Sequence, residues 1–475
     1  MKFKLIRSNK RFLYKGIIVE PQVRDFFTGR IWTRSNTPFH QEKVNAYIQQ
    51  NYFNVKSGIT SQPKGIFLRQ SFTCNRCYNQ IQHEFVQYNC AKCEKICVYC
   101  RHCINMGRVT SCTNLILWNG PLPLKYQKHV LDWDGTYTPA QKQAAQELTE
   151  SMNNKRSHLV HAVCGAGKTE ILFPAVLHAL NKGLRVCIAT PRTDVVLELF
   201  PRFQKVFPNT NIHALYGNAP KQAGFSQLVL STTHQLFRFE NAFDVELVDE
   251  ADAFPYTIDL ALQQAVLKAK KEGAPIAFVT ATPSTQILNT VKKENWSYSF
   301  IPKRYHNHPL PVPRFEALWS YEKGITRGKI PLKLIEWTEK RLSNREPFLI
   351  FFPTIQLMQK AIPLFQRMNE KILSVHAEDE HRKEKVIKLR NEEIPGLLTT
   401  TILERGITIN NVQVAVVGAE SKIFTSSALI QISGRVGRNV QFPEGDIVFF
   451  HHGITAEMDE ARNEILRLNK EGFGS

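Results

Sequence analysis

Short apolar runs that alternate with amphipathic stretches dominate the chain from residue 158 onwards. The run HLVHAV at 158–163 has the length and composition of a buried strand, and apolar residues recur at helical spacing between Ile171 and Leu180 in the segment that follows. Buried strands that alternate with helices are typical of parallel sheets with helices packed on both faces. The pattern therefore predicts an α/β fold for this part of the chain.

A second series of apolar runs lies beyond a proline-rich stretch of low periodicity at 301–315. We interpret that stretch as a linker and predict two α/β domains in tandem, at 130–300 and 316–465. A chain of 475 residues is also too long for one compact core. The runs expected to form strands of the second domain are 348–352, 372–375, 397–401, 414–418 and 447–450.

Basic residues set the N-terminal part of the chain apart. Residues 1–70 hold 13 lysines and arginines against 3 acidic residues, a large share of the net charge of +19. Such an excess favours a polyanionic partner, such as nucleic acid or an anionic membrane face. We treat 1–70 as a basic N-terminal region and 71–115, where cysteines gather, as a separate module.

Aromatic rings are interspersed among the bases of the N-terminal region. Rings that stack on nucleobases, beside bases that follow phosphates, would form a surface for single-stranded nucleic acid. The same rings can instead fill the core of a small basic domain, and we favour this interpretation. The residues concerned are Phe26, Phe27, Trp32, Phe39, Tyr47, Tyr52 and Phe53.

Eight of the ten cysteines fall between residues 74 and 112. A Cys-x-x-Cys turn points two thiolates the same way, and two such pairs complete a tetrahedral zinc site that stabilises a module too small for its own core. We expect zinc rather than an iron–sulfur cluster. Disulfides are not expected, because the N-terminus has no apolar run of the signal-peptide type. The cysteines are Cys74, Cys77, Cys90, Cys93, Cys97, Cys100, Cys103 and Cys112.

The spacing leaves open which cysteine pairs share a metal. The first pair can join the second pair in sequence. Alternatively, it can join the third pair and leave four cysteines for an optional second ion. The three pairs are Cys74/Cys77, Cys90/Cys93 and Cys100/Cys103, and the four cysteines left by the second arrangement are Cys90, Cys93, Cys97 and Cys112.

A glycine-rich loop directly follows the apolar run at 158–163 and opens the next helix. Glycines let backbone N–H groups curl around a phosphate at the positive end of a helix. Lys168 would neutralise the β- and γ-phosphate oxygens of ATP, and the Thr169 hydroxyl would hold Mg²⁺. The nucleotide-binding residues predicted here are Cys164, Gly165, Ala166, Gly167, Lys168 and Thr169.

Acidic and polar residues at later strand ends complement this loop. Asp249 ends an apolar run and can reach the metal, while its neighbour Glu250 can orient and deprotonate the attacking water. The hydroxyls of Thr280 and Thr282 can link the nucleotide state to a nucleic-acid path. Further upstream, we predict that the Gln141 amide reads the nucleotide base.

The second domain has no Lys-Thr loop of its own, which fits a partner domain that completes the site. Arg435 and Arg438 lie three residues apart, so we predict that a helix presents both on one face. Planar guanidinium groups suit phosphate contact and charge neutralisation in the transition state. Thr400 lies in a run of hydroxyls at a strand end, suited to phosphodiester and nucleotide contacts.

The order GAGKT, DEAD, TATP, TTILERG and QISGRVGR resembles that of superfamily 2 helicases. Longer stretches, among them HAVCGAGKTE, VDEADAFPY and YCRHCINMGRV, are similar to the ComFA family, the late-competence DNA-uptake ATPases of Gram-positive bacteria. The resemblance covers roughly residues 70–460. It implies an α/β fold of two RecA-like parallel-sheet domains in tandem with an N-terminal zinc-binding module. The implied activity is ATP hydrolysis by a DNA motor that single-stranded DNA stimulates.

The resemblance also implies roles for individual residues. Asp249 and Glu250 match the metal and water carboxylates of the family, and the nucleotide loop matches through Lys168 and its neighbours. The arginine-finger motif is matched by Gln431, Arg435 and Arg438; the segments implied to line the DNA path contain Thr190, Pro191, Arg192, Ser231, Thr232 and Thr233; and the implied zinc ligands are Cys74, Cys77, Cys100 and Cys103.

The implied setting is natural transformation, with the motor on the cytoplasmic side of the membrane. Its implied partners are single-stranded DNA, the membrane channel protein for DNA uptake and a small phosphoribosyltransferase-like competence protein. No apolar run approaches the roughly 18–20 residues needed to span a bilayer, so attachment to the inner face of the membrane would come through partners or charge. The implied cofactors are ATP, Mg²⁺ and Zn²⁺.

Two other functions compete with this interpretation. A replication-restart helicase resembling PriA also joins a cysteine-rich metal module to such a motor, but in that family the knuckles lie within the second motor half, whereas here they precede the first. A zinc-dependent DNA-binding protein with a vestigial ATP site would require a damaged catalytic set. Lys168, Glu250, Arg435 and Arg438 are all present.

Overall fold

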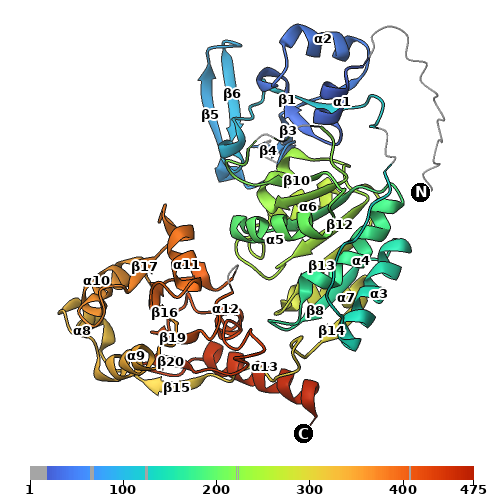
Figure 1. Cartoon of the computed structure of the whole chain (residues 1–475). Helices are drawn as coiled ribbons and strands as arrows, with labels where there is room; N and C mark the ends of the chain where they lie inside the picture. The colour runs from blue at the N-terminus through green and yellow to red at the C-terminus, as the bar shows by residue number, and fades with distance from the viewer. Residues whose placement is uncertain are drawn as a thin grey trace.

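An N-terminal domain followed by two α/β domains makes up the computed structural model, which describes residues 19–64, 69–123, 127–220, 222, 224–405 and 408–474. Each α/β domain is built on one parallel sheet (Figure 1). The predicted tandem of parallel-sheet domains is therefore confirmed. The first 18 residues of the expected basic region lie outside the described residues.

The N-terminal domain is a three-stranded sheet in the order β1-β7-β2, with two short helices packed beside it. Phe27, Tyr47, Tyr52 and Phe53 are buried in its core, as expected for rings that fill a small domain. The other three rings of the expected set are only half buried. The elements are α1 (Pro21–Phe27), β1 (Ile31–Thr33), α2 (Gln41–Gln49), β2 (Phe53–Ser57) and β7 (Asn114–Trp118).

The cysteine module is inserted within the N-terminal domain rather than placed after it. Two hairpins lie between β2 and β7, which pair with each other in the sheet. The expected boundary between residues 70 and 71 falls inside a strand, so the ranges 1–70 and 71–115 are corrected to one domain. The inserted strands are β3 (Ile59–Lys64), β4 (Arg69–Cys74), β5 (Phe85–Cys90) and β6 (Lys95–Cys100).

Seven parallel strands in the order β10-β11-β9-β12-β13-β8-β14 form the first α/β sheet. All residues of the central strands β8, β9 and β12 are buried, because helices cover both faces of the sheet. Helices α3, α4 and α5 pack on one face; α6 and α7 pack on the other, where the core continues into the cysteine module. The elements are α3 (Pro139–Asn153), β8 (His158–Ala162), α4 (Lys168–Asn181), β9 (Val186–Thr190), α5 (Thr193–Val206), β10 (Ile212–Leu215), β11 (Leu228–Thr232), β12 (Val245–Asp249), α6 (Leu260–Ala269), β13 (Ile276–Thr280), α7 (Thr285–Lys293) and β14 (Ser297–Ile301).

Six parallel strands in the order β15-β20-β19-β16-β18-β17 form the second α/β sheet, and each of the five expected runs overlaps one of them. Helices α8 to α10 cover one face and α11 to α13 the other. None of the described helices is long and apolar enough to cross a lipid bilayer. The elements are β15 (Arg314–Ala317), α8 (Tyr321–Thr326), α9 (Leu332–Asn344), β16 (Phe348–Phe351), α10 (Ile355–Gln366), β17 (Leu373–Val375), α11 (Arg382–Arg390), β18 (Gly396–Thr399), β19 (Gln413–Val417), α12 (Ser426–Ser433), β20 (Ile447–His451) and α13 (Ala456–Phe473).

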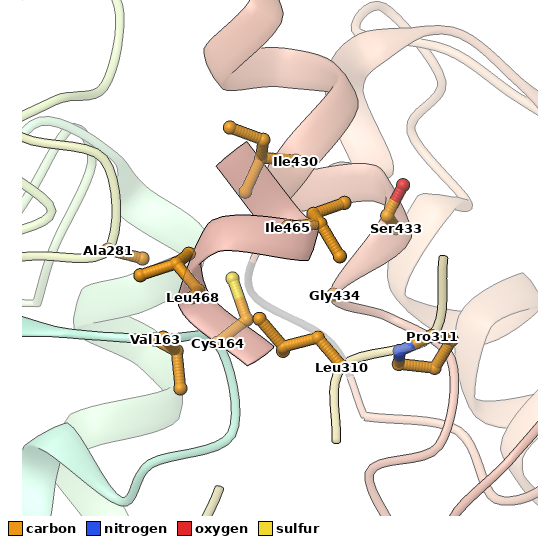
Figure 2. Close-up of a pocket in the computed structure, with 10 residues that line it drawn as sticks. All are labelled: Val163, Cys164, Ala281, Leu310, Pro311, Ile430, Ser433, Gly434, Ile465 and Leu468. Carbon is orange, nitrogen blue, oxygen red and sulfur yellow. The ribbon is translucent and has the colours of Figure 1, made fainter. Parts of the chain in front are cut away.

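The proline-rich linker is fixed against both α/β domains. Arg304 donates hydrogen bonds to the carbonyl oxygens of Val436 (3.2 Å) and Pro443 (2.7 Å) in the second domain. Figure 2 shows Leu310 of the linker beside Cys164 of the first domain, in a small apolar pocket that α12 and α13 of the second domain close. The two α/β domains therefore share a continuous apolar contact behind the glycine-rich loop.

Candidate functional site

The glycine-rich loop connects the carboxyl end of β8 to the first residue of α4, as the sequence predicts. Gly165 and Gly167 have positive φ angles of 81° and 74°, a conformation that favours glycine. A side chain on Gly167 would also collide with the amide of Gln141. The loop thus brings unpaired backbone N–H groups of the first turn of α4 to the carboxyl edge of the sheet.

A cavity of about 650 Å³ lies at this edge and is lined by residues of both α/β domains. Its volume lies in the range of small-molecule and cofactor sites. Most of the predicted nucleotide and catalytic residues meet there, but Cys164 and Ala166 lie buried behind the loop, where the Cys164 thiol donates to Gln431 Oε1 (3.2 Å). The predicted residues that line the cavity are Gln141, Gly165, Gly167, Lys168, Thr169, Asp249, Glu250, Gln431, Arg435 and Arg438.

Lys168 and two carboxylates face each other within the first domain's part of the cavity. Lys168 Nζ makes long hydrogen bonds, of 3.3 and 3.4 Å, to the carbonyl oxygens of Ala162 and Val163. Burial, together with the neighbouring charge of Glu250, raises the pKa of Asp249 to about 7, although Lys168 opposes the shift. Glu250 has a φ of 54°, and its buried Oε2 accepts no hydrogen bond among the described residues. These groups can bind a metal–phosphate ligand and accept a proton.

Arg435 and Arg438 line the cavity from a turn and not from a helix, so that prediction is wrong. Helix α12 ends at Ser433, and Gly437 continues the turn with a φ of 70°. A side chain on Gly434 would collide with Cys164 across the domain boundary, so this close approach requires glycine just after the helix.

The two arginines form a region of concentrated positive charge. Arg435 Nε and Nη2 donate to the carbonyl oxygen of Glu404 at 2.8 and 2.6 Å. Burial and the nearby Arg438 lower the pKa of Arg435 to about 9. Two adjoining guanidinium groups at low solvent exposure favour a polyanion in the cavity.

Gln141 serves a structural purpose at the cavity wall. Its Nε2 donates to the carbonyl oxygen of Ala166 (2.9 Å), and its Oε1 accepts from the backbone N–H of Thr138 (2.8 Å). The amide that the sequence suggests for reading a base therefore holds the glycine-rich loop against α3.

Trp133 and Tyr137 line the same part of the cavity, with ring centroids 4.4 Å apart, and sequence reasoning missed both. Aromatic rings at this position can stack on a nucleobase. Their place just before Gln141 in the sequence is the signal that could have identified them.

Polar contacts between the two α/β domains flank the cavity. Thr282 Oγ1 and Ser427 Oγ lie 2.7 Å apart, and Thr282 also donates to Asp252. Asp252 in turn contacts Arg405 and Gln431 of the second domain. Thr282 thus contacts the second domain, and its predicted link to a nucleic-acid path stays a prediction. The Asp252–Arg405 contact was not identified from the sequence.

The residues implied to line a DNA path lie at the carboxyl ends of β9, β11 and β18. Their hydroxyls are almost all buried; Thr400 alone among them is partly exposed. Arg192 donates to the carbonyl oxygen of Ile402 in the second domain (2.6 Å). A strand at this edge would therefore meet backbone groups and Thr400 rather than a row of free hydroxyls. The buried hydroxyl residues are Thr190, Ser231, Thr232 and Thr233.

Four buried cysteines from non-sequential pairs meet beside the first α/β domain. The Sγ atoms of Cys74 and Cys103 lie 3.9 Å apart, and those of Cys77 and Cys100 lie 3.7 Å apart. Tetrahedral zinc with Zn–S bonds of about 2.3 Å requires sulfur–sulfur distances of about 3.8 Å. Arg76 Nη2 donates to Cys103 Sγ at 3.0 Å, which stabilises a thiolate. The donor set and its geometry fit zinc.

The other four cysteines form a second cluster at the far end of the β5–β6 hairpin. Cys93 Sγ and Cys97 Sγ lie 3.3 Å apart, and Cys90 Sγ and Cys112 Sγ lie 3.7 Å apart. All four sulfur atoms lie within 4.8 Å of one another. The separations of 3.3 and 3.7 Å are longer than a disulfide bond, which measures about 2 Å. Their separation also suits a tetrahedral metal.

Comparison with known families places three models along the chain. Residues 11–117 match the competence protein ComFA N-terminal domain. Residues 135–285 match the res subunit of type III restriction enzymes, and residues 331–440 match the helicase conserved C-terminal domain. The two helicase models lie within the two parallel-sheet domains, one in each, and they identify the protein as an ATP-hydrolysing helicase.

Two curated relatives are similar along nearly the whole chain. The competence protein ComFA of Bacillus subtilis (strain 168) is 41% identical over 437 residues, which cover 92% of this chain and 93% of that protein. ComFA of Streptococcus pneumoniae (strain ATCC BAA-255 / R6) is 38% identical, over 84% of this chain and 90% of that protein. The replication restart protein PriA of Rickettsia prowazekii is 26% identical over only 44% of this chain and 34% of its own length.

Among solved structures, S. cerevisiae Dbp5 bound to RNA and ADP BeF3 has a similar fold. The TM-score is 0.55 with 16% sequence identity, over 71% of this chain and 88% of that chain. At this identity the similarity concerns the fold, and it identifies the two sheets as RecA-like domains.

Proposed function

Because the chain belongs to the ComFA family of competence proteins, we propose that it is an ATP-driven motor that moves along single-stranded DNA and helps to draw transforming DNA across the cytoplasmic membrane. The observation that carries the proposal is the shared cavity, to which one α/β domain contributes Lys168 and Glu250 and the other Arg435 and Arg438. A site built from two domains couples hydrolysis to their relative movement, since loss of the γ-phosphate removes contacts that hold them together.

The phosphates of ATP would lie on the glycine-rich loop. Backbone N–H groups at the start of α4 donate to the β-phosphate, and Lys168 neutralises the β- and γ-oxygens. Thr169 and Asp249 supply a hydroxyl and a carboxylate, the hard oxygen ligands that suit Mg²⁺. When bound there, Mg²⁺ would supply positive charge to offset the negative charge that develops on the phosphate oxygens. Trp133 and Tyr137 accommodate the adenine ring.

Glu250 and the two arginines would carry the chemical step. The buried Oε2 atom of Glu250 accepts no hydrogen bond from the described residues and lies 3.8 Å from Arg405 Nη1, so it can accept a proton from an attacking water. Arg435 and Arg438 face the cavity from the other domain and offset the negative charge of the transition state. Their action depends on closure of the two domains, because the second domain supplies both side chains.

DNA would lie across the carboxyl ends of β9 and β11 and of β18 in the second domain. The phosphodiester backbone can accept hydrogen bonds from backbone N–H groups at these strand ends and from the partly exposed Thr400. Contacts of this kind position a strand without reading its sequence, as a translocating motor requires. In this arrangement Thr190, Ser231 and Thr233 support the strand ends from inside the domain.

Each cysteine cluster would hold one zinc ion. The first cluster joins the β3–β4 and β5–β6 hairpins to the core of the first α/β domain. The second joins the end of the β5–β6 hairpin to Cys112, just before β7. A two-stranded hairpin has little core of its own, and zinc ligation can supply the missing stability.

The membrane channel protein for DNA uptake and a small phosphoribosyltransferase-like competence protein are the partners we propose, at the inner face of the cytoplasmic membrane. The alternative of a PriA-like restart helicase is weaker, because the similarity to PriA covers less than half of this chain. A DNA-binding protein with a vestigial ATP site is also a weaker alternative. Such a site would have lost catalytic residues, whereas in this chain these residues are present and line one cavity.

ATP hydrolysis rates with single-stranded DNA, duplex DNA and RNA of matched length test the proposal. We expect single-stranded DNA to stimulate hydrolysis most. Equal stimulation by RNA would contradict the assignment of DNA as the track. A rate that no nucleic acid changes would contradict the motor function itself.

A further inference from the structure

A second cavity, of about 790 Å³, lies between the N-terminal domain and the first α/β domain. We propose that it binds an unpaired base of single-stranded DNA together with the adjoining phosphate. This proposal rests on the proposed function, in which single-stranded DNA is the substrate. The binding site it assigns is separate from the cavity that the two α/β domains share. The aromatic and basic residues that line it include Phe26, Arg30, Trp32, Phe39, Tyr216 and Arg238.

Two arginines in this cavity have aromatic contacts in place of acidic ones. The guanidinium carbon of Arg30 lies 4.6 Å from the centre of the Phe26 ring, and that of Arg238 lies 5.0 Å from the centre of the Trp32 ring. Within the described part of the chain, neither arginine forms an ion pair, and the one acidic residue of the lining, Asp25, pairs with Arg24 at 2.7 Å. Two uncompensated cations in one cavity favour an anion.

The charge of this arginine pair is also partly desolvated. Burial, followed by the like charge of Arg238, lowers the pKa of Arg30 to about 10. A phosphate group between the two guanidinium groups would relieve their repulsion and could accept hydrogen bonds from both.

The rings beside the arginines form a rigid platform. Phe26 contacts Trp32 and Phe39 edge to face, with centroids 5.2 and 5.5 Å apart. The indole N–H of Trp32 donates to the carbonyl oxygen of Asn36 at 2.7 Å, which fixes the ring's orientation. These are the three N-terminal rings that the domain core leaves half buried. Stacking on such rings tolerates any base, as a motor that passes along arbitrary sequence requires.

The cavity adjoins the edge at which the proposed DNA path lies. The 3₁₀ helix Thr233–Arg238 begins in the segment implied to line that path and ends in the cavity. Six residues at a rise of about 2 Å each span about 10 Å between its ends. Leu215, also in the lining, pairs in register with Ser231 at the end of β11. A strand that crosses this edge therefore has a short route into the cavity.

Binding of oligodeoxythymidylate at fixed salt to the full chain tests the proposal. Arg238→Gln and Trp32→Leu should each weaken binding roughly fivefold or more, as loss of a stacked base or its phosphate contact does. Arg327→Gln is the matched control, because it removes the same charge from an exposed site in the second motor domain. ATP hydrolysis without DNA should be unchanged in all three variants.

A second measurement identifies the base itself. Oligonucleotides with one abasic position, moved along the strand, should reveal one position at which loss of the base weakens binding to the wild-type chain. In Trp32→Leu, loss of the base at that position should no longer weaken binding. Should this variant not fold, as judged by its thermal melting, Arg238→Gln with the same abasic series decides the question.

The outcomes separate this proposal from the proposed function. If the wild-type chain binds single strands but Arg238→Gln weakens binding no more than Arg327→Gln, the cavity proposal is overturned and the motor function stands. Unchanged binding in both cavity variants would indicate a protein or small-molecule ligand and would also overturn it. If the wild-type chain binds no single strand, both proposals fail.

Discussion

Asp252 of the first α/β domain and Arg405 of the second form a buried ion pair across the domain boundary. Arg405 Nη2 lies 2.6 Å from Asp252 Oδ2, and Nη1 lies 3.2 Å from Oδ1. Burial would raise the pKa of Asp252, but the guanidinium of Arg405 outweighs it and holds the pKa below its usual range. Gln431, which lines the proposed ATP cavity, also donates to Asp252 at 3.2 Å. The pair therefore stabilises the closed arrangement of the cavity.

Arg405→Ala should uncouple the two domains. The substitution leaves Asp252 buried without its partner, which costs about 3–5 kcal/mol in the closed arrangement. We expect DNA-stimulated ATP hydrolysis to fall roughly a hundredfold or more, and small-angle scattering should record a more extended particle. Arg367→Ala, at an exposed position in the same domain, should leave both unchanged. An unaltered stimulated rate in Arg405→Ala would exclude a role of the pair in closure.

Lys168→Ala should abolish ATP turnover and leave DNA binding within about twofold of the wild type. The ammonium group faces the cavity at the glycine-rich loop, whereas the proposed DNA edge is built from other strands. Steady-state hydrolysis and fluorescence anisotropy measure the two properties. Lys142→Ala, on the exposed side of α3, is the matched control and should behave as the wild type. Residual hydrolysis near the wild-type rate would refute the assignment of the nucleotide site.

Metal analysis of the purified chain should find two zinc ions. Cys100→Ser should remove one ion and lower the stability of the N-terminal domain strongly, because its cluster lies in the core that this domain shares with the first α/β domain. Cys112→Ser should remove the other ion at a smaller cost, since Cys112 is exposed. Cys187→Ala, a buried cysteine outside both clusters, should leave the zinc content unchanged. One zinc ion per wild-type chain would contradict a metal in the second cluster.

His158 should make the first α/β domain sensitive to acid. Hydroxyls of Ser151 and Ser299 lie 2.9 and 2.8 Å from its two ring nitrogens, and the side chain is fully buried. Burial lowers its pKa from 6.5 to about 4, although Glu147 opposes the shift. The unfolded chain therefore binds more protons between these values. The contribution of neutral His158 to the free energy of unfolding is fully present above pH 6.5 and is lost as the pH falls towards 4.

We expect this histidine alone to lower the free energy of unfolding by about 2 kcal/mol between pH 7 and pH 5. Denaturant midpoints at the two pH values measure the effect, and His158→Gln should show a smaller difference than the wild type. His83→Gln, at an exposed position, serves as the control and should show the wild-type difference. An equal loss in wild type and His158→Gln would contradict this assignment.

Local patterns were sufficient for the strands and the glycine-rich loop. Strands β8 and β12 are buried on both faces, so apolar residues predominate in them, and the glycines of the loop mark a backbone that other residues disfavour. The placement of Asp249 and Glu250 follows from the end of β12. Each of these features depends on residues close together in the chain.

Features set by distant contacts could not be predicted in this way. The helix expected around Arg435 ends at Ser433, and the next residue, Gly434, packs against Cys164, some 270 residues earlier in the sequence. The insertion of the cysteine module depends on the pairing of β2 with β7, and spacing alone does not reveal it. The same holds for Asp252 and Arg405, since an acidic and a basic residue far apart in sequence carry no mark of their pairing.

Arg304 ties the linker between the two α/β domains to the proposed ATP site. Besides the carbonyls of Val436 and Pro443, it contacts that of Gly437, within the turn that carries Arg435 and Arg438. Arg304 thus connects the linker to the turn that carries both arginines. If the second domain moved away from the first, the turn with Arg435 and Arg438 would move with it. The two arginines could then no longer contact the phosphates while the linker extends. In the proposed motor, release of the hydrolysed nucleotide and a step along DNA would then occur together.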